Sequence, residues 1–409
     1  MKSFTSLATR TTIAALLFWI VAPLSAQSVQ SYIYGTLHTR SGDSYEGFMR
    51  WGKEELFWHD IFNSTKTDDQ SNYRRPEKKS GRWFDFDWNF SSIWDNKYGG
   101  TSHTFACHFG DIKTLELKRS QTVLVGLKNG SIIEVRGGSN DIGESIYLNS
   151  PDLGEIKIPW DRIDQIDFSA APLHYEAPYE TMLYGTVETT RNRTFKGVVT
   201  WDMDERIGSD ILDGDSREGE HEIPFSLIKS ITRSGDGSNV ELRSGKELRL
   251  EGSNDVDDGN RGVVVFDANY NNIKIDWDDF QKVTFESIGD VIPTYDDYKV
   301  PTGIEAEVMG FDGARYKGLV AFDIDEFWEL EFLDGNDDQI EYQIPFRNIK
   351  RLVPKNRSYS MVFLRDGESL LLGDSQDVSS RNDGLLIFQE GEKEPIHVKW
   401  DDIDEIIFK

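Results

Sequence analysis

The residues best suited to chemistry are carboxylates that recur in two short acidic stretches. They are Asp202, Asp204 and Glu205 in the first stretch, and Asp323, Asp325 and Glu326 in the second. On a β-strand, alternate residues project from the same face, so each stretch is expected to present its alternate carboxylates on one side. Ca²⁺ takes six to eight oxygen ligands, and further aspartates follow each stretch. The spacing is not that of an EF-hand loop, so two interpretations stay open: a Ca²⁺ site, or acidic faces that only meet solvent.

A second group of candidate residues gathers between residues 65 and 102. This segment holds eight aromatic residues, and seven Lys or Arg against six Asp or Glu, in a chain with 72 acidic and 45 basic residues. The candidate binding residues are Arg74, Arg75, Arg82, Trp83, Phe86, Trp88 and Trp94. Trp and Arg dominate binding hot spots, and aromatic rings anchor partners. The segment predicts either a recognition element for a protein or glycan, or a long hairpin whose aromatic face packs on the fold.

Sequence signatures of enzymes are missing. None of the seven histidines forms an H-x-x-x-H or H-E-x-x-H pair, and there is no G-x-S-x-G motif or glycine-rich phosphate loop. Cys107 is the single cysteine, so neither an intrachain disulfide nor a multi-thiolate metal site is expected. Its alternation with Phe105 and Phe109 predicts a core thiol. We predict no catalytic residue, although a polysaccharide hydrolase that uses acidic loop residues stays an alternative.

The elements that position these residues follow a pattern that occurs three times. Leu183-Tyr-Gly-Thr matches Ile33-Tyr-Gly-Thr at an offset of 150, and Phe195-Lys-Gly matches Tyr316-Lys-Gly at an offset of 121. Self-similarity at a constant offset indicates tandem structural units. The predicted units of about 105–140 residues span 31–169, which contains the insertion 65–102, then 181–286 and 303–409. Proline-bearing stretches between them predict linkers.

Each unit is expected to be all-β and doubled again. Both halves of a unit begin with a hairpin and end with strand, short turn and strand, and alternating residues such as Val240 and Leu242 indicate half-buried strands. A Trp-Asp-Asp motif recurs near each end, as at Trp277 and Trp400. Its first Asp is expected to cap the short turn while the Trp packs inward. The Gly-Ser-Asn-Asp loop at residue 252 is expected to be a structural turn.

This order of elements resembles that of SH3-like small β-barrels, including the Sm-like and PRC-barrel types. In those folds, too, a short helical turn precedes the last strand, as at Pro224-Phe-Ser-Leu-Ile228. The resemblance implies two small barrels in each unit. It implies no activity, because that fold serves mainly as a binding scaffold for unrelated partners.

The N-terminus predicts export. Lys2 and Arg10 precede the apolar run Ile13–Ala22, and Leu24-Ser-Ala26 precedes Gln27, so residues 1–26 match a secretory signal peptide cleaved after Ala26. The apolar run is too short to span a bilayer, and no later segment approaches that length. We therefore expect a periplasmic, cell-envelope or extracellular protein.

The charge restricts the partners. A formal net charge of −27 argues against nucleic acid and anionic membranes, which require a basic surface. The sequence predicts an exported, non-catalytic β-repeat protein that acts as a binding or scaffold module for a protein or glycan of the envelope. No cofactor is expected apart from the Ca²⁺ considered above, and a carbohydrate-binding protein is the nearest alternative.

Overall fold

The computed structural model describes residues 29–66, 104–119, 121–137, 141–176, 178–267, 271–289, 291–392 and 394–409. The predicted signal peptide and the seven candidate binding residues of the segment 65–102 lie outside these residues. Every named element in the described ranges is a β-strand or a short 3-10 helix, so the all-β prediction is confirmed. Among the described residues, no helix has the length and apolarity needed to cross a membrane.

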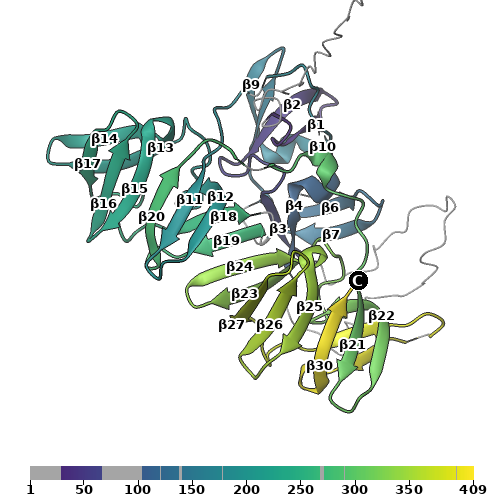
Figure 1. The fold of residues 1–409 in the computed structure, drawn as a ribbon. Helices are drawn as coiled ribbons and strands as arrows, with labels where there is room; N and C mark the ends of the chain where they lie inside the picture. The colour runs from purple at the N-terminus through teal and green to yellow at the C-terminus, as the bar shows by residue number, and fades with distance from the viewer. Residues whose placement is uncertain are drawn as a thin grey trace, which may run out of the picture.

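The strands fall into three consecutive parts of the chain (Figure 1). The N-terminal part, residues 29–176, contains β1 (Tyr34–Thr39), β2 (Ser44–Trp51), β3 (Ile61–Lys66), β4 (Thr104–His108), β5 (Ile112–Arg119), β6 (Thr122–Leu127), β7 (Ile132–Arg136), β8 (Ile146–Ser150), β9 (Gly154–Ile158) and β10 (Ile163–Phe168). The central part, residues 178–289, contains β11 (Tyr184–Thr189), β12 (Thr194–Thr200), β13 (Ile211–Ser216), β14 (Gly219–Pro224), β15 (Ile228–Ser234), β16 (Gly237–Leu242), β17 (Glu247–Leu250), β18 (Val263–Asp267), β19 (Asn271–Ile275) and β20 (Phe280–Phe285).

The C-terminal part, residues 291–409, contains β21 (Glu305–Gly310), β22 (Arg315–Phe322), β23 (Phe332–Asp337), β24 (Ile340–Pro345), β25 (Ile349–Pro354), β26 (Tyr359–Leu364), β27 (Ser369–Gly373), β28 (Leu385–Phe388), β29 (Ile396–Val398) and β30 (Ile403–Phe408). Short 3-10 helices precede several of the strands. They are η2 (Phe109–Asp111), η3 (Trp160–Arg162), η4 (Phe225–Leu227), η5 (Tyr295–Asp297), η6 (Phe346–Asn348) and η7 (Trp400–Asp402).

Every pairing among the described strands is antiparallel, and the three parts share most of their strand pairs. They differ in that β3 pairs with β7 and β23 with β27, whereas β13 and β14 form a separate two-stranded sheet. In the N-terminal part the sheet order is β4-β3-β7-β6-β5-β10-β1-β2-β8-β9. The central part repeats this with β11–β12, β11–β20, β12–β18 and β15–β20, and the C-terminal part with β21–β22, β21–β30, β22–β28 and β25–β30. For example, Gly35 faces Gly47, Gly185 faces Gly197 and Ala306 faces Gly318.

The pairing differs from the expected succession of two separate halves. Hairpin β1–β2 of the first half pairs with β8 and β10 of the second half. Strand β3 of the first half pairs with β7 of the second, and β5 pairs with β6. The two halves thus exchange strands. The sequence could not reveal this, because both halves carry the same order of elements and either pairing buries the same faces.

The glycine in the Tyr/Phe-x-Gly motif is explained by close strand approach. A Cβ at this glycine would come within 2.0–2.2 Å of a backbone carbonyl oxygen on the neighbouring strand. The pairs are Gly47 with Asn149, Gly197 with Phe266, and Gly318 with Phe388. Any larger residue would push β2, β12 or β22 off its partner strand.

In each part, a loop of the second half is hydrogen-bonded to a strand of the first half. A loop aspartate accepts the backbone N–H of the third residue of a strand: Asp141 from Asn63 at 2.5 Å, Asp255 from Asp213 at 2.7 Å, and Asp377 from Asp334 at 2.7 Å. The indole N–H groups of Trp51 and Trp201 donate to the carbonyl oxygens of Asp141 and Asp255. These contacts agree with the structural role predicted for the Gly-Ser-Asn-Asp loop.

The Trp-Asp-Asp motif packs as expected but does not cap. Trp160, Trp277 and Trp400 are buried. The residues before η3 and η7 are Pro159 and Lys399, and no side-chain cap bond forms at either helix. The capping prediction is therefore wrong, because the aspartates lie inside the helical turn rather than before it.

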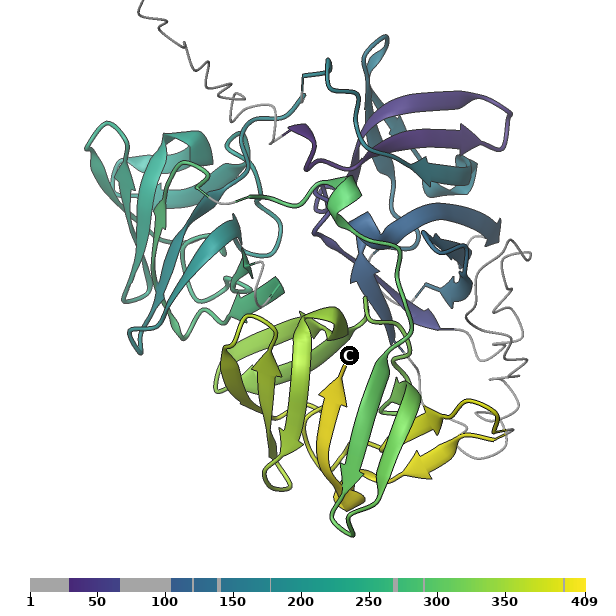
Figure 2. The ribbon, with the colours of Figure 1, turned by 45° about the vertical axis from the view of Figure 1, so that its right-hand side comes forward.

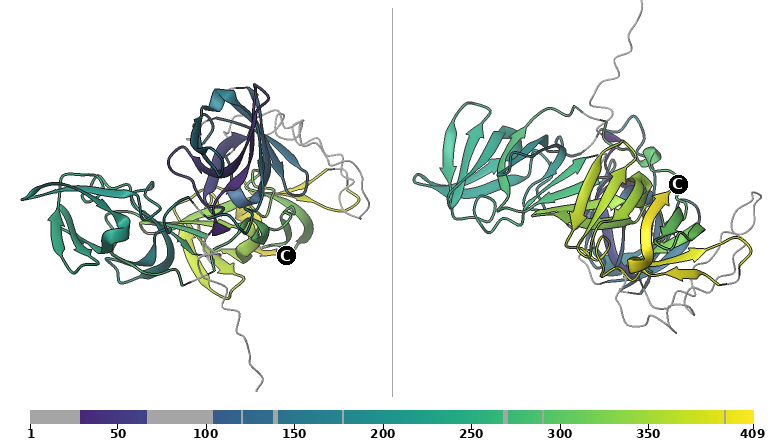
Figure 3. Two further views of the ribbon diagram at one scale, coloured as in Figure 1. Left: turned by 90° about the horizontal axis from the view of Figure 1, so that it is seen from above. Right: turned by 60° about the horizontal axis from the view of Figure 1, so that its bottom comes forward.

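The three parts share their cores. One apolar cluster runs through the central and C-terminal parts, and a second joins the N-terminal part to Met182, Phe266, Trp328 and Leu330 of the other two. Cys107 is fully buried in this second cluster, as predicted. Figures 2 and 3 show the central part extending to one side, while the C-terminal part lies against the N-terminal part.

Candidate functional site

The acidic stretches form tight turns rather than strands. Asp202 and Met203 have φ angles of 45° and 75°, and the N–H of Trp201 donates to the carbonyl of Glu205 at 2.9 Å. Asp323 and Ile324 have φ angles of 48° and 60° in the equivalent turn. The expected alternation of carboxylates along a strand is therefore wrong, because the left-handed backbone reverses the chain within four residues.

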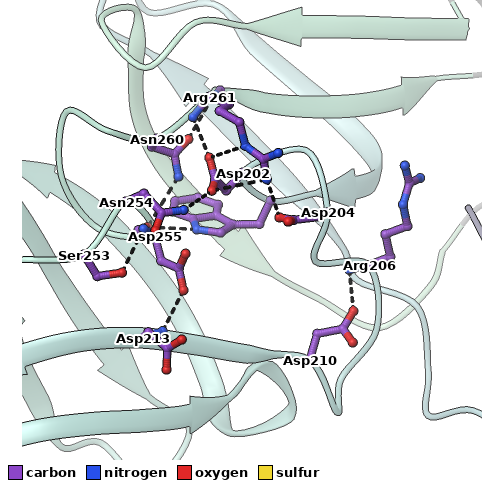
Figure 4. Close-up of polar contacts among 12 residues, drawn as sticks. Asp202, Asp204, Arg206, Asp210, Asp213, Ser253, Asn254, Asp255, Asn260 and Arg261 are labelled. Atoms are coloured by element: carbon purple, nitrogen blue, oxygen red, sulfur yellow. Dashed lines mark hydrogen bonds and ion pairs between the residues drawn. The ribbon is translucent and has the colours of Figure 1, made fainter. Parts of the chain in front are cut away.

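The turn at residues 202–205 gathers three carboxylates, of which Asp202 and Asp204 are labelled in Figure 4. One oxygen from each of Asp202, Asp204 and Glu205 lies within 4.8 Å of the others, and within the described ranges this is the one group of three such acidic, thiol or imidazole ligands. Arg261 already neutralises part of this charge. Its guanidinium lies 2.7 Å from Asp204 and 3.4 Å from Asp202, and its backbone N–H donates to Asp202 at 2.5 Å. Asn254 donates to the other oxygen of Asp202.

Burial and crowding keep Glu205 protonated. Desolvation, followed by the neighbouring Asp204 carboxylate, raises the pKa of Glu205 to about 10. A neutral carboxyl group is a poor Ca²⁺ ligand, because metal ligands must be deprotonated. The Ca²⁺ prediction remains open, but in this arrangement Arg261 supplies the positive charge that a metal would bring.

The equivalent turn of the C-terminal part is built differently. Asp323 accepts the backbone N–H of Asp383 at 2.5 Å, and Asp325 pairs with Lys66 of the N-terminal part at 2.8 Å. Burial, followed by the charge of Asp325, raises the pKa of Glu326 well above its usual value. The two acidic stretches that look alike in sequence are thus satisfied by different partners.

Three acidic residues at matching positions connect the parts. Asp60, Asp210 and Glu331 each close a turn by accepting two backbone N–H groups, from Leu56 and Phe57, Arg206 and Ile207, and Phe327 and Trp328 respectively. Each also binds a cation from a different part of the chain. Arg206 lies 2.5 Å from Asp60, Arg50 lies 3.3 Å from Asp210, and Lys66 lies 2.6 Å from Glu331.

Two further contacts fix the C-terminal part. Arg347 donates to both carboxylate oxygens of the fully buried Asp111, at 2.7 and 3.0 Å. Strand β19 of the central part pairs with β24 of the C-terminal part, so that one sheet runs through both. The three parts are therefore held against one another by ion pairs, shared sheet and shared core.

A polar cavity of about 730 Å³ lies where the three parts meet. Its wall comes from the N-terminal part through residues including His59, Asn63 and Thr104, from the central part through Arg206, and from the C-terminal part through Gln343. The volume falls within the range of small-ligand sites. Five acidic residues (Glu54, Glu55, Asp60, Asp141 and Glu341) and three basic residues (Arg206, Arg261 and Lys274) line it.

Two buried groups in this wall lack hydrogen-bond partners. Nδ1 of His59 and Nε of Arg206 are enclosed by protein atoms and make no hydrogen bond. The His59 ring lies parallel to the ring of Phe266, with centroids 4.1 Å apart. Burial lowers the pKa of His59 to about 4, so its imidazole is neutral at pH 7. Unpaired buried polar groups are costly, and because protein encloses both atoms, a ligand in the cavity does not reach them in this conformation.

Two carboxyl groups of the cavity wall have strongly raised pKa values. Burial, followed by the charge of Asp141, raises the pKa of Glu55 to about 8, and burial raises the pKa of Asp141 to about 7. The same two positions recur in the central part as Glu205 and Asp255, whose pKa burial raises to about 6. Neither Glu205 nor Asp255 lines the cavity. The pair of acidic residues therefore belongs to a structural feature that occurs in two parts of the chain, rather than to a catalytic site.

The cavity where the three parts meet was not predicted from the sequence. Of the predicted site residues, the structure gathers Asp202, Asp204 and Glu205 into one turn and leaves Asp323, Asp325 and Glu326 in another, and none of the six lines the cavity. The equivalence of Asp60, Asp210 and Glu331 at the offsets of 150 and 121 was visible in the sequence. The contact between Arg206 and Asp60, 146 residues apart, was not.

Comparisons with known proteins identify no family. No family model matches the chain, and no curated protein matches it. A solved structure described as "Streptogramin B lyase structure" is similar at 10% identity over 73% of this chain and 94% of that one, with a TM-score of 0.12. Because a TM-score this low does not indicate a common fold, the similarity carries no argument about this protein.

Proposed function

We propose that the protein is an exported, non-catalytic binding module built from three copies of one unit. In this proposal each unit is a pair of SH3-like small barrels that exchange strands. The support is the similar strand pairing of the three parts and the matching turns closed by Asp60, Asp210 and Glu331. The signal sequence at residues 1–26 supports an envelope or extracellular location.

The binding site of this proposal is the cavity at the junction of the three units. The observation that carries it is the cavity of about 730 Å³ itself, whose wall combines residues of all three units. The excess of acidic residues disfavours an anion, and the guanidinium of Arg206 disfavours a cation. A neutral, polyhydroxylated ligand such as an oligosaccharide suits a wall of mixed charge, because hydroxyl groups donate and accept hydrogen bonds.

A hydrolase is the weaker candidate for the same cavity. Glycosidases need one asymmetric pair of carboxyl groups beside the bond that breaks. Here the shifted pair of Glu55 and Asp141 recurs as Glu205 and Asp255 outside the cavity. Repetition at sites without a cavity favours a structural role.

Calorimetric titration of the full chain with a panel of neutral oligosaccharides tests the proposal. Thr104 is exposed, begins β4 and lines the cavity, so Thr104→Trp is expected to block it without disturbing the core. Thr194 is also exposed and also begins a strand, β12, but lies outside the cavity wall, so Thr194→Trp is the matched control. Binding that the first variant loses and the second keeps supports the proposal. Binding that survives Thr104→Trp, or heat on no member of the panel, contradicts it.

The insertion 65–102 is proposed as a second contact for a protein or glycan partner of the envelope. Its first residue, Thr65, and Thr104, two residues beyond its end, both line the cavity. A pull-down from envelope extracts with the chain lacking residues 67–103, compared with the full chain, tests this contact. An unchanged set of captured partners would contradict it.

A further inference from the structure

The pairing of β19 with β24 shows how two parts of this chain join edge to edge. Lys274 stands opposite Glu341 and Ile273 opposite Tyr342 in this antiparallel pair. The Lys274 ammonium lies 3.7 Å from the Glu341 carboxylate. Beside the strands, Arg193 of the central part pairs with Asp337 of the C-terminal part at 2.7 Å. The contact therefore combines backbone hydrogen bonds with two charge pairs.

The strands that correspond to β19 and β24 in other parts of the molecule include two whose outer edges are unpaired among the described strands. Strand β9 corresponds to β19, since Ile156-Lys-Ile158 precedes Trp160 as Ile273-Lys-Ile275 precedes Trp277. Strand β14 corresponds to β24, since Ile223-Pro-Phe corresponds to Ile344-Pro-Phe. Among the described strands, β9 pairs only with β8, and β14 pairs only with β13.

Both open edges face outward. Gly154, Glu155 and Lys157 of β9 are exposed, as are Gly219, Glu220 and Glu222 of β14. Figure 1 places β14 at the far tip of the central part and β9 at the outer rim of the N-terminal part. Within one copy, the two strands do not pair with each other.

The known register transfers to these edges with charge complementarity. It sets Lys157 opposite Glu220 and Ile156 opposite His221, as Lys274 faces Glu341 and Ile273 faces Tyr342. At the flank, the positions of Arg191 and Arg193 are taken by Ser41 and Asp43, and those of Asp337 and Asp338 by Ser216 and Arg217. In the transferred register Asp43 faces Ser216 and Ser41 faces Arg217, so neither flanking charge pair is kept and the contact depends on Lys157 and Glu220.

One position opposes the contact. Glu155 stands opposite Glu222, where the internal pair has Asn272 opposite Gln343. Like charges directly opposite each other destabilise a strand pair, so the contact is expected to be weaker than its internal counterpart. Salt and lower pH are expected to strengthen it at this position.

We propose that β9 of one copy pairs with β14 of a second copy, antiparallel and in the register of β19 with β24. The two surfaces of this contact differ, so the assembly is head-to-tail and continues beyond a dimer as an open chain or a ring. Strand addition at an exposed sheet edge is an established mode of recognition.

Strand β29, the third counterpart of β19, fits β14 less well. It has three residues against five in β9, and Pro395, which lacks an N–H donor, precedes it. His397 takes the place of the lysine. The proposal therefore commits to β9.

Sedimentation velocity of the full chain at rising protein concentration tests the proposal. We expect a series of species larger than a monomer, weakened about tenfold by Lys157→Glu, which sets two acidic residues opposite each other. The double variant Lys157→Glu with Glu220→Lys restores opposite charges and is expected to recover association. Lys113→Glu, which makes the same charge change at an exposed position on β5, is the matched control.

The outcomes separate the alternatives. Loss with Lys157→Glu and recovery in the double variant support the contact. A chain that stays monomeric at every concentration, or an assembly that Lys157→Glu leaves unchanged, overturns it. Assembly that instead depends on His397 would assign the contact to β29 and also overturn the proposal as stated.

Discussion

The guanidinium of Arg347 binds both carboxylate oxygens of Asp111 across the contact between the C-terminal and N-terminal parts. Asp111 is fully buried, and the Arg347 charge lowers the pKa of its carboxyl group even though burial alone would raise it. The same guanidinium donates to His108 at 3.2 Å and lies 5.4 Å from the ring centroid of Tyr298. One arginine thus holds together three elements that are far apart in the sequence.

Arg347→Leu is expected to destabilise the protein by about 3–5 kcal/mol, because it leaves a buried carboxylate without its partner. The double variant with Asp111→Asn should recover a large part of this loss, since no unpaired charge remains. Urea unfolding measures both. Arg315→Ala, which breaks an exposed pair with Glu307, is the control and should cost about 1 kcal/mol or less. Equal losses in Arg347→Leu and the control would show that the buried pair does not hold the parts together.

Glu205 is expected to make stability depend on pH. Its pKa is raised from 4.5 to about 10 in the folded state, so its stabilising contribution is complete below pH 4.5 and is lost as the pH rises toward 10. The melting temperature should therefore fall between pH 7 and pH 9, and Glu205→Gln should make this slope shallower. His59 does not interfere in this range, because its lowered pKa of about 4 affects stability only in acid. Glu218→Gln, at an exposed turn, is the control. An unchanged slope in Glu205→Gln would contradict the prediction.

The Ca²⁺ hypothesis can be decided at Arg261. Because its guanidinium already pairs with Asp202 and Asp204, we expect millimolar Ca²⁺ to leave the melting temperature of the unaltered chain unchanged. In Arg261→Ser the carboxylates lose this cation, and Ca²⁺ should then raise the melting temperature in a way that a chelator reverses. A chelator-sensitive rise in the unaltered chain would instead establish the metal site predicted from the sequence.

Trp201→Phe is expected to destabilise the central part by about 1–3 kcal/mol, because the buried carbonyl of Asp255 loses its indole donor. Phenylalanine fits the backbone here, since Phe322 occupies the corresponding position of the C-terminal part. Thermal unfolding of Trp201→Phe measures the loss. A loss no greater than that of an exposed substitution would show that water replaces the indole.

The strands and turns were accessible from the sequence because they depend on neighbouring residues. Alternation at Val240 and Leu242, the turn glycines and the burial of Trp160, Trp277 and Trp400 follow from local pattern. Cys107 was correctly expected in the core. The acidic turns were misjudged because the positive φ angles of Asp202 and Met203 occur in residues other than glycine, which gives no sequence signal.

The candidate site was not accessible in the same way. The cavity wall joins residues such as His59, Arg206 and Gln343 from three distant stretches of the chain. Which cation meets which carboxylate depends on how the parts dock, and a chain with 117 Lys, Arg, Asp and Glu residues offers many equivalent choices. Composition alone does not show which of these charged residues pair with each other.

By itself, the sequence determined that this chain is all-β and where its small internal motifs recur. Only the tertiary structure decided that the halves exchange strands, that Arg206 meets Asp60 and Arg347 meets Asp111, and that a polar cavity opens between the parts. The physical reason is the distance along the chain over which each feature is specified. A strand is specified by alternation over a few residues, whereas its partner is chosen by packing, charge and loop closure over more than a hundred.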